Sequence, residues 1–117
     1  MNQNLNEKQA RFQHDNIPTR LGHIASDLAR IKSFSSIAHK EVVSSVISET
    51  KWFIEWTAAE IEPEQAEELV NIQVQLAGWE LTWDKIWSDD NARTQVAEQA
   101  GIWSKRVLDM SGLLLSH

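Results

Sequence analysis

Residues 64–87, EQAEELVNIQVQLAGWELTWDKIW, decide the fold, because they carry two apolar stripes where a surface helix carries one. The first stripe recurs at steps of three and four residues, the spacing that forms one helix face; its members are Leu69, Ile72, Leu76, Trp79, Trp83 and Ile86. The second stripe lies roughly opposite at about 100° per residue; its members are Val70, Val74, Ala77 and Leu81. We therefore predict one continuous helix over 64–87, packed on both sides.

The composition favours a single all-helical domain. Of the 117 residues, 42% are hydrophobic and 24% charged, which is ordinary for a globular protein. There are only four glycines and two prolines, so long helices are favoured over a turn-rich β fold. We expect a polar N-terminal arm or short helix over 1–15 and one helical domain over 16–117.

Three further helices are expected, over 17–34, 37–61 and 89–114. Pro18 suits the first turn of the first of these, and Pro63 ends the second and opens the helix at 64. Ser88 is the expected N-cap of the last. Because the links are short, the fold class predicted is all-α, an antiparallel up-down-up-down four-helix bundle.

Polar side chains of the helix over 17–34 are expected in water. The expectation covers Arg20, Asp27 and Arg30, with His23 and Asp27 forming a surface pair four residues apart. Gly78 and Gly101 interrupt two helices, and either a close helix approach or room for Trp79 and Trp103 would explain them.

Several large apolar side chains fall outside the main seams and need a cover. Trp52 and Trp56 are four apart and point away from the inner face of the helix over 37–61. Tryptophan is enriched at the centres of protein interfaces. We expect a small non-enzymatic interaction or regulatory protein that works as a homodimer, or with another protein partner, through Trp52, Trp56, Val70, Val74 and Leu81.

The alternative is a ligand-binding helical bundle. Its tryptophan-rich core would hold a flat apolar or aromatic molecule among Trp79, Trp83, Trp103 and His39. The competing explanation is that these tryptophans are large core residues at helical spacing.

An enzyme is the least favoured interpretation, because the sequence does not place acid, base and nucleophile side chains at a spacing that would form a catalytic site. There is no cysteine and no Glu-x-x-His pair of the kind that di-iron bundles use, so neither a metal nor a cofactor is expected. The glutamates at 60, 62, 64, 67 and 68 crowd one turn, where acidic side chains favour a helix start.

The net charge and the N-terminal sequence limit the classes of partner and the cellular location that can be expected. A net charge of −6 argues against nucleic acid, which needs a basic surface. Residues 1–15 have no apolar run that would make a signal peptide, and no stretch approaches the roughly 18 apolar residues of a membrane span. We expect a cytoplasmic protein.

Overall fold

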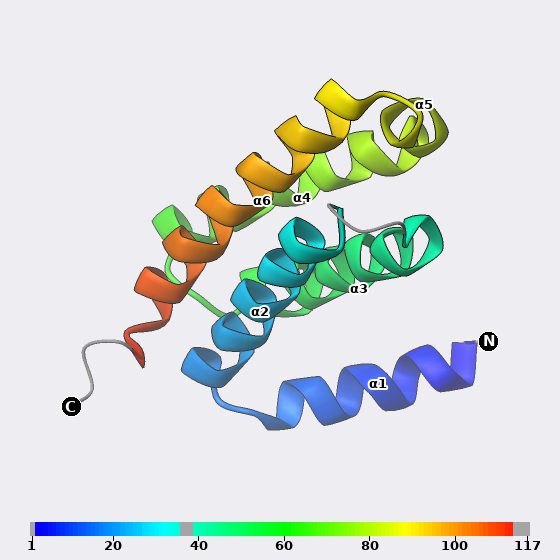
Figure 1. Cartoon of the computed structure of the whole chain (residues 1–117). Helices are drawn as coiled ribbons and strands as arrows, with labels where there is room; N and C mark the ends of the chain where they lie inside the picture. The colour runs from blue at the N-terminus through cyan, green and yellow to red at the C-terminus, as the bar shows by residue number, and fades with distance from the viewer. Residues whose placement is uncertain (1, 36–38, 114–117) are drawn as a thin grey trace.

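The chain is all-helical in a computed structural model that describes residues 2–35 and 39–113 (Figure 1). No strand occurs in these two ranges. The helices are α1 (Asn2–His14), α2 (Ile17–Ser35), α3 (Lys40–Ala58), α4 (Pro63–Leu81), α5 (Trp83–Trp87) and α6 (Asp90–Ser111). The expected helix start at 37 lies outside the described residues.

The α2 helix is the centre of the packing. Its seam of Leu21, Ile24, Leu28 and Ile31 is at most 2% exposed, because α6 and α3 cover it from two sides. Figure 1 shows α2 and α6 side by side in front of α3 and α4. The packing order is therefore α6, α2, α3, α4, which is compatible with a bundle.

The contact between α4 and α6 is the sparsest of those that link neighbouring long helices. The α4 helix contacts α3 extensively but touches α6 at few points, and the short α5 helix packs mainly on α6. The inner stripe of α4 is nevertheless buried at Leu69, Ile72 and Leu76. One of the candidate sites described below is a cleft between α4 and α6.

The expected continuous helix over 64–87 is wrong, because the helix breaks at Thr82 between α4 and α5. Thr82 has φ −118° and ψ 21°, and its hydroxyl donates to the carbonyl of Gly78 at 3.1 Å. Such back-bonding by a β-branched residue often bends helices. The turn buries Trp83, whose Nε1 donates to the carbonyl of Lys40 at 3.1 Å.

Residues 2–14 form a helix, α1, that packs on α3. Its anchor is Phe12, which is 5% exposed and stacks on Phe53 with ring centroids 4.1 Å apart. The Phe12 ring also lies 6.0 Å from that of Trp56. The N-terminal helix α1 therefore covers Trp56, one of the two α3 tryptophans that were expected to contact a partner.

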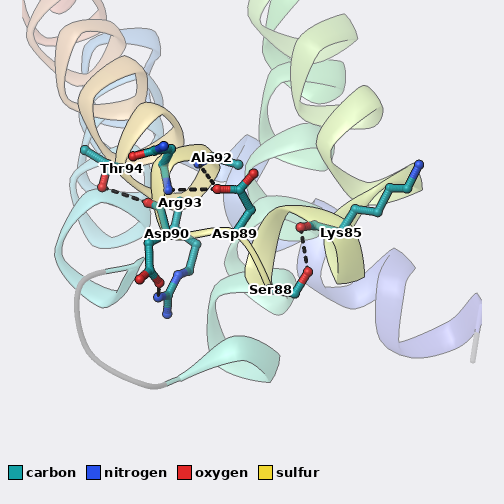
Figure 2. Close-up of polar contacts among 8 residues, drawn as sticks. Lys85, Ser88, Asp89, Asp90, Ala92, Arg93 and Thr94 are labelled. Carbon is teal, nitrogen blue, oxygen red and sulfur yellow. Dashed lines mark hydrogen bonds and ion pairs between the residues drawn. The ribbon is translucent and has the colours of Figure 1, made fainter.

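Both ends of α6 are set by local chemistry. Asp89, and not Ser88 as expected, is the N-cap: its carboxylate accepts from the backbone N–H groups of Asn91 and Ala92 (Figure 2). The Ser88 hydroxyl instead donates to the carbonyl of Lys85. The helix ends at Ser111, before the expected 114, because Gly112 adopts φ 74°, the left-handed conformation of a helix C-cap.

Candidate functional site

The outer face of α4 is an exposed apolar stripe, which we call the α4 stripe and define as Val70, Val74 and Leu81. These side chains are 40%, 64% and 88% exposed. They lie on the opposite side of the helix from the buried Leu69, Ile72 and Leu76, as the two-stripe pattern requires. Leu81 is the most exposed large apolar residue in the described chain.

The α4 stripe is held in place by polar contacts between α4 and α3. Gln73 donates through Nε2 to the carbonyl of Lys51 at 3.2 Å and to Glu55 Oε1 at 2.9 Å. Lys51 also forms an ion pair with Glu80. These contacts fix the rotation of α4, so its apolar stripe is presented on a rigid element.

Trp52 is a further exposed aromatic side chain, on α3. Its neighbour in the chain, Lys51, accepts the hydrogen bond from Gln73 of α4 through its backbone carbonyl. Trp52 is 40% exposed and stacks on Trp56 with centroids 5.8 Å apart. An exposed indole supported from behind is suited to an interface.

The structure places Trp56 elsewhere than the other four expected interface residues. It is only 6% exposed, enclosed by Phe12, Phe53 and Trp52. Trp56 therefore supports Trp52 from within the chain and offers little surface of its own. The sequence pattern showed that Trp56 lies outside the α3 seam, but it did not reveal that α1 covers it.

Gly78 lies beside the α4 stripe and leaves open space. A Cβ built there meets nothing within 4 Å. Gly101 differs, because a Cβ there would approach Cδ of Lys32 at 3.0 Å. Lys32 is an exposed, flexible side chain that can move aside, so packing within the described chain requires glycine at neither position.

The four residues that were expected to bind a ligand do not line one common pocket. Trp79 and Trp103 stack at 5.2 Å, and Trp79 lines a cleft of about 230 Å³ between α4 and α6. Trp83 is buried and bonded to Lys40, while His39 is exposed and lies 6.2 Å from the Phe34 ring. Neither Trp83 nor His39 lines the Trp79 cleft.

A carboxyl pair, with Asp27 buried and Glu49 partly buried, lies where α1, α2 and α3 meet, and sequence reasoning missed it. Asp27 was expected in water but is 4% exposed and interacts with Glu49. Burial, together with the hydrogen bond and negative charge of Glu49, raises the pKa of Asp27 to about 8, against the opposing effect of Arg30. The Oδ2 atom of Asp27 is buried and has no hydrogen-bond partner in the described chain, an environment that disfavours the ionised carboxylate.

Two cations flank this pair. Lys8 of α1 lies 2.5 Å from Glu49 Oε1, and Arg30 lies 3.3 Å from Asp27 Oδ1. Burial would raise the pKa of Glu49, but the hydrogen bonds from Asp27 and Lys8 outweigh it and lower this pKa. At neutral pH Glu49 is therefore ionised while Asp27 holds the proton.

Arg20 was also expected in water but is 6% exposed and ties α1 to the other helices. It donates to the carbonyls of Asp15 at 2.9 Å and Gln13 at 2.7 Å, and to Glu60 Oε2 at 2.8 Å. Satisfying the last carbonyls of α1 gives this arginine a structural role. The expected pair of His23 with Asp27 is wrong, because His23 contacts Asp15 at 3.2 Å.

Within residues 2–35 and 39–113, no cluster of three or more histidine, aspartate or glutamate side chains is arranged to hold a metal ion. None of the helices described there combines the length and apolar character needed to cross a bilayer. The exposed α4 stripe and the Trp79 cleft contain all but two of the residues expected from the sequence to form an interface or a ligand site that are not buried in the chain, the exceptions being Trp52 and His39. Compared with protein families, curated proteins and solved structures, the chain matches none of them.

Proposed function

We propose that this protein is a small non-enzymatic interaction or regulatory protein that acts as a homodimer through the α4 stripe. The observation that carries the proposal is the exposure of Val74 and Leu81, at 64% and 88%, on a helix whose other face is already buried. Contiguous exposed apolar surface on a soluble domain typically marks an interaction site. The cytoplasmic location expected from the sequence stays a prediction.

The occupant proposed is a second copy, with the two α4 helices antiparallel. A parallel pair would bring the exposed Glu64 and Glu67 of both chains together, whereas an antiparallel pair with its two-fold axis at the level of residue 76 separates them. In the antiparallel arrangement Val74 of one chain faces the Gly78 region of the other. The missing side chain at Gly78 then allows close helix approach, which accounts for its open space.

Trp52 completes the proposed interface. The 19 residues of α4 span about 28 Å. A stable dimer usually buries about 1,200–2,000 Å² in total, so residues beside the helix must contribute. The exposed Trp52 on α3, which follows Lys51 in the chain, supplies further aromatic surface.

The same proposal includes the arrangement of the four long helices. We propose that α2, α3, α4 and α6 form an antiparallel up-down-up-down bundle. The support is the packing order α6, α2, α3, α4, with a sparse contact between α4 and α6 completing the ring. In this arrangement α4 is flanked by α3 and α6, which leaves its outer stripe for the second chain.

The test is the double variant Val74→Glu, Leu81→Glu, measured by light scattering after size exclusion. Both side chains are exposed in one chain, so the variant should fold normally and run as a monomer of 13.4 kDa. Trp56 is unsuitable for this test, because a charge at a buried site would unfold the chain.

The matched control is Ile102→Glu, since Ile102 is 50% exposed on α6 and lies outside the stripe. It should leave the wild-type dimer intact. A double variant that keeps the mass of two chains would show that the α4 stripe is not the interface. A wild-type protein that is monomeric alone would direct the search to a different protein partner for the same surface.

A further inference from the structure

The lining of the cleft between α4 and α6 is uncharged, although 24% of the chain's residues are charged. It is formed by Gln75 and Trp79 of α4, by Ile86 of α5, and by a row on α6 consisting of Ala92, Gln95, Val96 and Gln99. The α6 residues follow one another at helical spacing, so they share the face that looks toward α4. No lysine, arginine, aspartate or glutamate lines this cleft.

The three glutamines give the cleft its hydrogen-bonding character. A carboxamide offers two N–H donors and a carbonyl acceptor. Gln75, Gln95 and Gln99 have no side-chain hydrogen bonds within the described chain, unlike Gln73, which bonds to α3. The cleft therefore presents free donors and acceptors without any net charge.

Trp79 supplies a flat apolar wall. Its ring is held by stacking on Trp103, 5.2 Å away and inclined by 28°, and Trp103 is itself only 4% exposed. The buried partner fixes the orientation of Trp79, so the indole is prepared for contact with another planar group. Stacking on a tryptophan favours aromatic rings that bind offset or edge-on.

The size of the cleft limits the ligand. Its volume of about 230 Å³ is below the range of about 300–1,000 Å³ typical of sites for drug-sized molecules. A molecule of one or two fused rings fits this space. Gln75 and Gln95 are exposed, so the cleft opens to solvent, and no charged side chain lines it to pair with an ionic ligand.

We infer that this cleft binds an uncharged planar heteroaromatic ring that carries N–H donors and carbonyl or ring-nitrogen acceptors on its edge, as free pyrimidine and purine bases do. Trp79 contacts the ring, and the amides of Gln75, Gln95 and Gln99 bond its edge. This ligand site uses the α6 side of α4, so it does not depend on the α4 stripe or on dimer formation.

The experiment is a titration of the full-length protein with uracil and with adenine, followed by NMR of the indole and glutamine side-chain N–H groups. The Trp79 signal is assigned by its loss in Trp79→Phe. At least one base should shift the Trp79 signal and the glutamine signals in a saturable way. The double variant Gln95→Leu, Gln99→Leu should weaken binding about tenfold or more, since each lost hydrogen bond costs roughly threefold to tenfold.

Two controls separate specific binding from other effects. Gln9→Leu on α1, far from the cleft in the packing order, should leave the affinity unchanged. Toluene and 1,3-dimethyluracil test the need for hydrogen bonds, and both should bind more weakly than uracil if uracil is the base that binds. The inference is overturned if neither base moves the Trp79 signal, if toluene binds as well as the bases, or if the double variant binds as well as the wild type.

Discussion

At the scale of single residues, the environment of Asp27 differs from the one that the sequence pattern predicted. Asp27 lies at the edge of the α2 seam, where helical spacing alone allows either water or a neighbouring helix. The structure buries it against Glu49, and no hydrogen-bond donor reaches Asp27 Oδ2. Arg20, seven residues earlier on the same edge, is buried as well. Helical periodicity missed both because their partners lie outside α2: the end of α1 and Glu60 for Arg20, and Glu49 of α3 for Asp27.

The stability of the protein should therefore fall as the pH rises from about 4 to about 8, and this contribution is lost above that. The folded protein holds the Asp27 proton up to about pH 8, whereas an unfolded chain releases it near 3.8. Between these values the folded state binds more protons, so raising the pH favours unfolding. Asp27→Asn keeps the neutral form and should raise the free energy of unfolding at pH 9 by about 1–3 kcal/mol.

Urea unfolding of wild type and Asp27→Asn at pH 5, 7 and 9 measures this effect. The difference between the two proteins should grow with pH, and it isolates Asp27 because the other titratable groups are the same in both. Equal pH dependence in the two proteins would mean that Asp27 is ionised in the folded state.

At the scale of the helices, local periodicity predicted the apolar seams but not the ends. Leu69, Ile72 and Leu76 are buried as the first stripe of 64–87 implies. The same stripe continues through Trp83 and Ile86 with unbroken spacing, so nothing in the pattern signalled the turn at Thr82. That turn is set by the tertiary contacts of α5 with α6 and of Trp83 with Lys40.

The α1 helix shows how few residues can dock a polar element. Phe12 is its one fully enclosed aromatic side chain, and Lys8 adds the ion pair with Glu49. Phe12→Ala should destabilise the protein by about 3 kcal/mol or more, because it removes a buried ring and leaves Phe53 and Trp56 partly uncovered.

Limited proteolysis within residues 2–14 and urea unfolding together measure this loss. The variant should be cut faster in α1 and should unfold at lower urea than wild type. Arg11→Ala, an exposed change on the same helix, is the control and should behave as wild type. Unchanged cleavage in Phe12→Ala would contradict the anchoring role given to this ring.

At the scale of the whole molecule, the sequence predicted an all-helical chain and a second apolar stripe over 64–87 that is covered by a neighbour, whereas this stripe is exposed at Val70, Val74 and Leu81 in the single chain. Four of the five residues expected at an interface, Trp52, Val70, Val74 and Leu81, are exposed together with Gly78. Trp56 is covered within the chain, and Trp79 with Trp103 forms the only expected ligand pair that the structure stacks together. Interfaces and clefts depend on which helices fail to cover a face, which periodicity alone does not specify.

The mass of the wild-type protein in solution, measured by light scattering after size exclusion over a wide dilution range, tests the central claim most directly. We predict a stable mass of twice the 13.4 kDa chain, because the α4 stripe and Trp52 would otherwise remain in water. A single-chain mass at every concentration would contradict the homodimer and leave the α4 stripe without the occupant proposed for it.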